Sequence, residues 1–311
     1  MYCYQCEQTA KGTGCTVVGV CGKDPKTAAL QDLLVYTAEG VSMYAHRART
    51  FGKDDRDADV FVIEALFSTV TNVNFDAERV AGLIRAGVGI RDRVRATYEK
   101  AARAAGESPD ELTGPATFEP ALDIDSLVAQ AEGVSIERRK AELGEGITGL
   151  QDLMLYGLKG AAAYVDHALI LGVEDPGTFA MFHEGLDFLT RSDATAEELL
   201  GWCLKTGEIN LKAMELLDGA NTRSYGHPEP TVVRVTPIKG KAILVSGHDL
   251  KDLKTLLEQT EGKGINVYTH GEMLPALAYP ELKKHSHLAG TTEVPGRTRP
   301  RSSPSSPVQS S

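Results

Sequence analysis

Two segments of the chain carry the same hydrophobic pattern. Residues 30–52 read LQDLLVYTAEGVSMYAHRARTFG, and residues 150–172 read LQDLMLYGLKGAAAYVDHALILG. At an offset of 120 positions they share nine residues, and within this match a Tyr, a Gly, a Tyr and an Ala recur every four positions. That spacing is typical of one face of a helix, and the glycine permits a second helix to approach closely. The sequence therefore predicts a long helix in each segment.

The similarity continues downstream of both segments. Glu64-Ala-Leu66 corresponds to Glu184-Gly-Leu186, and residues 77–82 correspond to 196–201 at an offset of 119. A duplication of several amphipathic helices predicts two small antiparallel bundles over residues 28–227, joined through the Gly- and Pro-rich stretch 106–120. Cys203 aligns with Ile84 in this repeat, so we expect a buried thiol that acts as a small hydrophobe.

The pattern changes to an α/β type over residues 228–290. Short apolar runs at 242–245 and 265–268 predict buried strands, and Asp249 is placed to cap a helix that runs to about Gln259. A second helix or turn is expected at 273–279. A strand–helix–strand–helix order predicts a parallel sheet, whose ligands bind beyond the carboxyl ends of the strands. His248 and Glu272 follow the two strands, so they are candidate ligands of one transition metal; the alternative is a pair of solvated loop residues.

Four of the five cysteines fall within the first 21 residues. Cys3, Cys6, Cys15 and Cys21 have the spacing C-x2-C-x8-C-x5-C, with several glycines between them. Such crowding predicts four thiolates that converge on one inorganic site over residues 1–27, and an iron–sulfur cluster is favoured. A zinc site with four cysteines is the main alternative, although zinc sites more often use two closely spaced pairs. Disulfides are a further alternative.

Composition excludes several classes of function. The 311 residues carry a formal net charge of −10 and a pI near 5.4, which argues against a nucleic-acid partner. No apolar run is long enough to span a membrane, and the N-terminus lacks the pattern of a secretory signal. We therefore expect a cytoplasmic protein without membrane contact, in a compartment that keeps thiols reduced.

Three motifs together resemble the hybrid-cluster proteins, which are also called prismane proteins or hydroxylamine reductases. They are the four-cysteine motif, the repeat segment GLKGAAAYVDHALILG, and the pair VSGHDL and VYTHGEMLPAL. The resemblance covers about residues 1–290. It implies a mainly α N-terminal domain of two three-helix bundles, followed by the start of a Rossmann-like α/β domain with a parallel sheet.

The resemblance also implies cofactors and a reaction. Cys3, Cys6, Cys15 and Cys21 would hold a [4Fe–4S] cluster that relays electrons from a redox partner protein. His248 and Glu272 match two ligands of the hybrid [4Fe–2S–2O] cluster. The implied reaction is the two-electron reduction of the small molecule hydroxylamine to ammonia and water. Nitric oxide reduction is also attributed to the family, and the sequence leaves open which of the two is the substrate.

The sequence departs from the family after about residue 290. Residues 291–311 form an Arg-, Ser- and Pro-rich tail that we expect to be disordered. We hypothesise that the chain is truncated, for example by a frameshift, which continuous reading of its gene would test. No cysteine follows Cys203, so we expect the hybrid cluster to lack its thiolates and residues 228–290 to be poorly stable alone. Two alternatives to an enzyme stay open: a non-catalytic iron–sulfur electron-transfer module and a zinc-stabilised helical scaffold.

Overall fold

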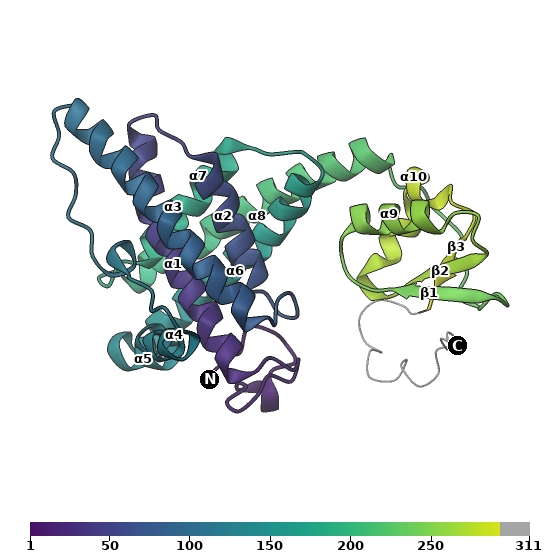
Figure 1. The fold of residues 1–311 in the computed structure, drawn as a ribbon, viewed down its shortest axis with the longest axis horizontal. Coiled ribbons are helices and arrows are strands. Elements are labelled where there is room, and N and C mark those ends of the chain that lie inside the picture. Colours follow the sequence, from purple (N-terminus) through teal and green to yellow (C-terminus); the bar gives the residue numbers. More distant parts are fainter. Residues whose placement is uncertain (293–311) are drawn as a thin grey trace. The chain divides into compact units, whose positions relative to one another are not determined.

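The computed structural model describes residues 1–292. The chain divides into two compact units, which we describe separately. The helical unit comprises Met1–Asp166 and Glu174–Glu215, and the sheet unit comprises His167–Val173 and the described residues from Leu216 onward. The described chain is mainly α-helical with a small parallel sheet, as the sequence predicted (Figure 1).

Six long helices form two equivalent sets. The first set is α1 (Pro25–Thr50), α2 (Arg56–Ser68) and α3 (Ala77–Ala104), and the second is α6 (Glu145–Ile170), α7 (Pro176–Leu189) and α8 (Ala196–Tyr225). The start of each helix in the second set lies 119 or 120 positions after its counterpart. The duplication read from the sequence is thus a duplication of three consecutive helices.

Shorter elements precede and separate the two sets. A single 3-10 turn, η1 (Ala10–Gly12), interrupts the N-terminal segment. The connection between α3 and α6 contains η2 (Gly114–Thr117), α4 (Ile124–Ala131), η3 (Glu132–Val134) and α5 (Ile136–Leu143). Nothing in the first copy corresponds to these four elements, so they are an insertion between the repeats.

The repeat residues explain where the helices begin and end. Asp55 and Asp175, 120 positions apart, each accept a hydrogen bond from a backbone N–H in the first turn of α2 and α7. Gly52 and Gly172 follow α1 and α6 with φ of 66° and 78°, a conformation that favours glycine at a helix C-terminus. The backbone N–H after each glycine bonds to a carbonyl of the last helical turn. Equivalent caps therefore define equivalent helices.

Helix α1 forms the centre of the helical unit. It packs against α3, α2 and α7, so its buried face contacts helices of both copies. The buried side chains on α1 are mainly apolar, and they include Leu30, Leu33, Leu34, Ala38 and Val41. This arrangement makes the copies mutually dependent, because the same helix supplies the core of one and covers the other.

The sheet unit contains three parallel strands in the order β1-β2-β3. They are β1 (Lys241–Val245), β2 (Ile265–Thr269) and β3 (Leu288–Thr291), and the connections hold α9 (Leu250–Thr260), η4 (Gly271–Ala278) and α10 (Pro280–Lys283). Asp249 caps α9 as predicted, and Leu253 and Leu257 of this helix lie in the core of the unit. The strand β3 was not expected. It includes Thr291, the first residue assigned to the tail, whereas residues 293–311 lie outside the described part.

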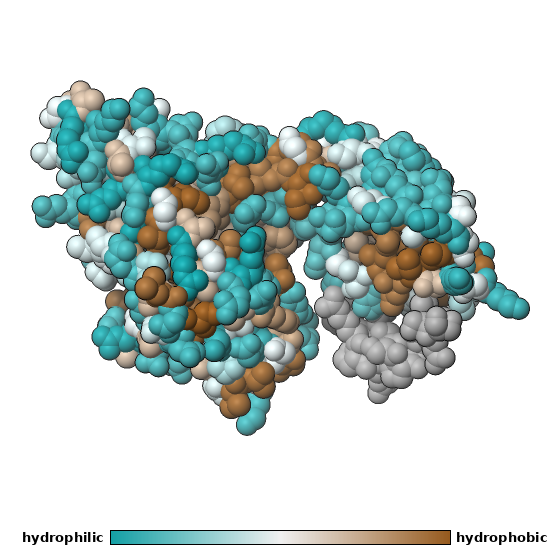
Figure 2. Space-filling model, viewed as in Figure 1, coloured by the Kyte–Doolittle hydropathy of each residue, from teal (hydrophilic) through white to brown (hydrophobic). Residues whose placement is uncertain are grey.

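Apolar side chains remain exposed on both units. Figure 2 shows hydrophobic surface that interrupts the hydrophilic exterior of each one. On the sheet unit these side chains include Val232, Val235, Ile238 and Leu244. On the helical unit, α8 exposes Leu200, Leu204, Leu211 and Met214. The described residues therefore leave part of the apolar surface of each unit uncovered.

Across residues 1–292, no helix combines the length and the apolarity needed to span a bilayer.

Candidate functional site

The structure places the four N-terminal cysteines around one pocket. Cys3, Cys6, Cys15 and Cys21 all line it, together with loop residues such as Thr9. Cys3 and Cys15 face each other in an antiparallel bridge. The backbone N of Cys3 lies 3.1 Å from the carbonyl O of Cys15, and the backbone N of Cys15 lies 2.8 Å from the carbonyl O of Cys3. The loop between Cys6 and Cys15 turns back through η1, and this turn brings the third cysteine beside the first.

The backbone around this pocket is arranged to contact sulfur. The N–H of Ala10 donates to Sγ of Cys15 at 3.4 Å. Hydrogen bonds from the backbone at Ala10 and Val20 hold the pKa of the Cys15 thiol below its ordinary value. A Cβ at Gly19 would lie 2.9 Å from Sγ of Cys21, so only glycine leaves room for that sulfur. Donors aimed at sulfur and glycines that permit close approach are features of iron–sulfur loops.

The donor set fits a four-thiolate cluster in its chemistry. All five cysteines of the chain are free thiols, so none is used in a disulfide. Within residues 1–292, no group of three or more His, Cys, Asp or Glu side chains lies at metal-holding distances. The four thiols thus share a pocket without being drawn together at one point. Their role as ligands stays a prediction.

The cysteine segment is anchored to the helical unit by polar side chains that precede or separate the cysteines. The hydroxyl of Tyr4 donates to Asp152 of α6. Nε2 of Gln5 donates to the carbonyl of Thr69 at 3.0 Å, and Nζ of Lys159 donates to Oε1 of Gln5 at 3.5 Å. Burial is the main cause that raises the pKa of Tyr4, and its hydrogen bond to Asp152 adds to the effect. These contacts fix the Cys3–Cys6 loop against α6.

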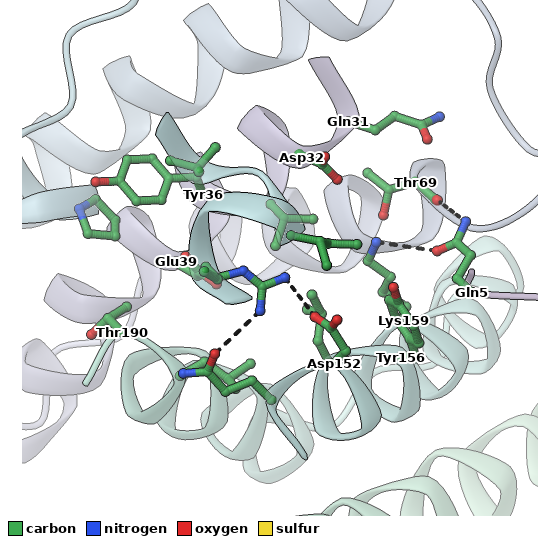
Figure 3. A pocket seen from close by; sticks show the side chains of 18 of the residues that line it. Gln5, Gln31, Asp32, Tyr36, Glu39, Thr69, Asp152, Tyr156, Lys159 and Thr190 are labelled. Carbon is green, nitrogen blue, oxygen red and sulfur yellow. Dashed lines mark hydrogen bonds and ion pairs between the residues drawn. The ribbon is translucent and has the colours of Figure 1, made fainter. Parts of the chain in front are cut away.

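A larger cavity of about 450 Å³ adjoins the cysteine pocket within the helical unit (Figure 3). Cys3, Gln5 and Lys23 line both spaces. The cavity is lined by equivalent faces of α1 and α6. Three identical pairs of the repeat face it, and they are Gln31 with Gln151, Asp32 with Asp152, and Tyr36 with Tyr156. A fourth pair differs in charge, with Glu39 on α1 and Lys159 on α6.

The charged groups of this cavity are not equally paired. Asp152 is buried and accepts from Nη2 of Arg139 at 2.6 Å. Asp32 and Glu39 have no hydrogen-bond or ion-pair partner in the described part of the chain, and the surface they retain lines the cavity. Burial raises the pKa of Asp32 to about 6 and that of Glu39 to about 7, while nearby cations oppose the shift. Burial lowers the pKa of Lys159 to about 8.

Sequence reasoning did not identify this cavity. The repeat identities contained the signal, because Gln31 and Asp32 are polar residues that recur within an otherwise apolar helical pattern. Arg139 gave no signal, since it comes from the inserted α5. Lys159, which also lines the cavity, differs from its repeat counterpart Glu39 and was therefore not among the residues that the two copies share.

The second predicted site lies at the carboxyl edge of the sheet unit. His248 follows β1 and Glu272 lies in the first turn of η4 after β2, and these strands are adjacent and parallel. Both side chains are exposed. His167 is close enough that the charge of His248 adds to the burial that lowers its pKa, and Asp249 opposes the shift. The described residues bring no third ligand to this edge at metal-holding distance, so this pair alone does not fit a multi-iron cluster.

Cys203 belongs to neither site. Its Sγ donates to the carbonyl of Leu150 at 3.6 Å, and burial raises the pKa of the thiol. The side chain is partly exposed, however, whereas Ile84 at the equivalent position is buried. The expectation of full burial was therefore wrong, although the thiol has the character of a packing residue.

The chain matches the Prismane/CO dehydrogenase family over residues 1–293. It is 53% identical over 290 residues to a hydroxylamine reductase of Rhodospirillum rubrum, and 52% identical over 290 residues to one of Methanocella arvoryzae. Each alignment covers 93% of this chain and 53% of the relative, so the chain spans about half the length of these curated relatives.

A solved structure, carbon monoxide dehydrogenase IV from Carboxydothermus hydrogenoformans, matches with a TM-score of 0.30 and 18% identity. The match covers 90% of this chain and 41% of that one, and it is too weak to support an argument. The family match over nearly the whole chain and the identity to its relatives are decisive. This chain belongs to the Prismane/CO dehydrogenase family.

Proposed function

We propose that this chain is the electron-relaying part of a hydroxylamine reductase, with a [4Fe–4S] cluster held by Cys3, Cys6, Cys15 and Cys21. The observation that carries the proposal is the placement of the four thiols around one pocket in a chain about 50% identical to hydroxylamine reductases. A bound cluster would accept and release single electrons there. A redox partner protein in a reducing compartment such as the cytoplasm would supply them.

This chain's residues have distinct tasks at the pocket. Thiolates of the four cysteines would bind iron, and the Ala10 N–H would donate to sulfur and favour added negative charge. Tyr4 and Gln5 hold the first cysteine pair against α6 and the loop after α2. The glycine at position 19 leaves the space that the Cys21 sulfur occupies.

The full reaction would be the reduction of hydroxylamine by two electrons and two protons to ammonia and water. His248 and Glu272 are proposed as two ligands of the hybrid cluster at which this reaction takes place. For the described residues we propose electron relay from the four-cysteine pocket to the cluster that His248 and Glu272 would help to hold.

Iron analysis of anaerobically purified protein tests the proposal. We expect about four irons and four sulfides per chain and a cubane signal in the low-temperature EPR spectrum of the dithionite-reduced protein. Serine substitution of any of the four cysteines should lower the iron content sharply. Cys203→Ser is the matched control and should retain the iron.

The alternatives give different results. One zinc and no iron per chain would replace the proposal with a zinc-stabilised helical scaffold. Iron content that is unchanged in all four serine variants would remove the cysteines as ligands. Hydroxylamine turnover that is unchanged in all four serine variants would overturn the electron-relaying role of the cysteine cluster.

A further inference from the structure

Duplication has given the cavity two equivalent aspartates, but only one of them is neutralised. Asp152 accepts hydrogen bonds from Nη2 of Arg139, at 2.6 Å, and from the hydroxyl of Tyr4. Asp32 lies at the same position of α1, yet no described residue reaches it with a hydrogen bond or an ion pair. The inserted helix α5 contributes its arginine to one copy only. A carboxylate that is removed from water without a partner is unstable as an ion, and a proton neutralises it most simply.

The unpaired aspartate is electrostatically connected to the cysteine pocket. Lys159 links the two, because its Nζ donates to Gln5, which lies between Cys3 and Cys6. Negative charge on Asp32 and on Cys3 acts in the same direction on Lys159, raising its pKa against the effect of burial. Figure 3 shows Asp32, Lys159 and Gln5 directed toward the same part of the cavity. Negative charge added near Cys3 therefore acts on Lys159, the group that faces Asp32.

We propose that Asp32, with Glu39 farther along the same cavity, is a proton-binding site that takes up one proton when an electron reaches the cluster at the cysteine pocket. This inference rests on the proposed cluster. If the bound cluster were reduced by one electron from its donor, the Asp32 carboxylate would take one proton from a hydronium ion of the solvent. One O–H bond of hydronium would break and one O–H bond would form on Asp32, so the proton would balance the electron and the total charge of the site would stay constant.

The surroundings of Asp32 favour this response. The charged and titratable groups that line the cavity come from every element around it. They are Tyr36 and Glu39 on α1, Arg139 and Glu142 on α5, Asp152, Tyr156 and Lys159 on α6, Tyr2, Cys3 and Lys23 in the N-terminal segment, and Arg191 after α7. Arg139 is bound to Asp152, and Glu142 to Arg138, so neither is available to compensate a new charge. Asp32 and Glu39 are the carboxylates left to respond.

The pH range of the effect follows from the sign of the shift. Burial raises the pKa of Asp32 to about 6, so the group is largely ionised at pH 7 and protonated at low pH. An added negative charge nearby favours the neutral acid and raises this pKa further. Proton uptake is therefore expected above about pH 6 and should be absent well below it.

A redox titration of the full iron-loaded chain tests the inference. The cluster is reduced stepwise with dithionite and followed by EPR from about pH 5 to pH 9, a range that brackets the pKa of Asp32. Above about pH 6 the midpoint should fall as pH rises, by at most about 59 mV per unit, which is one proton per electron. Asp32→Asn should flatten this dependence. Glu142→Gln removes a cavity carboxylate that already has a partner, and it should leave the slope unchanged.

A second measurement needs no variant to fold. The infrared difference spectrum between the reduced and oxidised wild-type protein should show the carbonyl stretch of a newly protonated carboxyl group at pH 7. A chain with its full iron content but a pH-independent midpoint and no such band would overturn the proton site while the cluster stands. A chain without iron would instead overturn the proposed function. A slope that survives in Asp32→Asn with unchanged iron would exclude Asp32 as the acceptor.

Discussion

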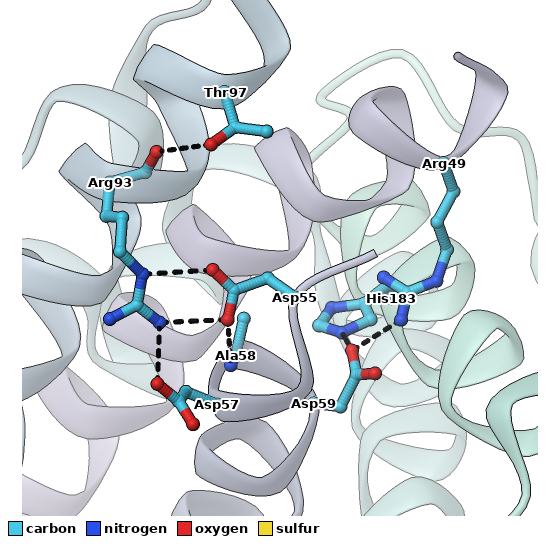
Figure 4. Close-up of polar contacts among 8 residues, drawn as sticks. All are labelled: Arg49, Asp55, Asp57, Ala58, Asp59, Arg93, Thr97 and His183. Atoms are coloured by element: carbon cyan, nitrogen blue, oxygen red, sulfur yellow. Dashed lines mark hydrogen bonds and ion pairs between the residues drawn. The ribbon is translucent and has the colours of Figure 1, made fainter. Parts of the chain in front are cut away.

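Nε2 of His183 lies 2.9 Å from Oδ1 of Asp59, and this contact joins the two copies of the helical repeat (Figure 4). Asp59 belongs to α2 and His183 to α7, and the other ring nitrogen of the histidine lies 3.0 Å from Oγ of Ser42 on α1. All three residues are buried, and none of them lines either cavity described above. The order Ser–His–Asp is that of a hydrolase triad, but without access for a substrate it is a structural cross-link.

Asp59→Ala should strongly destabilise the helical unit. Asp59 also accepts from the guanidinium of Arg49 at 2.5 Å, so its removal leaves a largely buried cation and a buried imidazole without their partner. Breaking a buried pair in this way costs about 3–5 kcal/mol. Urea unfolding followed by circular dichroism measures the loss.

Asp57→Ala is the matched control for that measurement. Its carboxylate is on the same helix and pairs with Arg93, but the side chain is 73% exposed. We expect a change of about 0–1 kcal/mol. If the two variants had the same free energy of unfolding, the buried contact of Asp59 would contribute no more to stability than the exposed contact of Asp57.

The same histidine should make stability depend on pH. Burial, more than any other cause, holds the pKa of His183 below its ordinary value, and the nearby Arg49 adds to this. The unfolded chain therefore binds a proton at a higher pH than the folded one, and stability falls as the pH drops below about 6.5. The slope from one such group is at most about 1.4 kcal/mol per pH unit.

Unfolding curves measured at several pH values between about pH 5 and pH 8 give this slope. His183→Gln removes the titrating group, and its stability should change less with pH in that range, whatever its absolute value. An identical slope in both proteins would assign the acid sensitivity to other groups.

Much of the fold could be predicted because local signals repeat. Gly52 and Gly172 end their helices in the same conformation, and Asp55 and Asp175 begin the next ones with the same cap. These are short-range effects, so two copies of one pattern predict two copies of one structure. Asp249 likewise predicted the start of α9 correctly.

The candidate site was harder to predict because its parts meet only in three dimensions. The cavity joins α1 and α6 to a helix that has no counterpart in the repeat, and no spacing along the chain indicates that Arg139 reaches Asp152. The strand β3 has only four residues, too few for a clear alternation of apolar positions. The cysteine motif was recognisable because its spacing is local.

Gly40→Ala should destabilise the protein, although alanine is the better helix former. A Cβ at Gly40 would lie under 3.0 Å from the backbone carbonyl of Pro115, which cannot move aside as a flexible side chain would. Such overpacking costs about 1–3 kcal/mol. Thermal unfolding should show a lower midpoint for this variant.

The repeat provides the matched control for Gly40. Gly160 is the equivalent residue of α6, and a Cβ there would meet no atom within 4 Å. Gly160→Ala should therefore be neutral or stabilise the helix by up to about 1 kcal/mol. The reverse order of the two variants would contradict the close approach of α1 to the segment at Pro115.

Arg139→Met should weaken both the core of the helical unit and the attachment of the cysteine segment. Asp152 is 1% exposed, and without Arg139 it keeps only the hydroxyl of Tyr4. An uncompensated buried carboxylate costs about 3–5 kcal/mol. Because Tyr4 binds the same carboxylate beside Cys3, limited proteolysis should also cut the N-terminal segment faster in this variant.

Arg138→Met is the control, since it removes the neighbouring arginine of the same helix. Arg138 is 59% exposed and pairs with Glu142 at the surface, so its loss should change stability by less than about 1 kcal/mol. Equal sensitivity of the two variants to urea and protease would mean that α5 as a whole, rather than the Arg139–Asp152 pair, holds the segment. A large effect confined to Arg139→Met would show that the Arg139–Asp152 ion pair itself holds the segment. Arg139 would then account for the difference between the paired Asp152 of α6 and the unpaired Asp32 of α1.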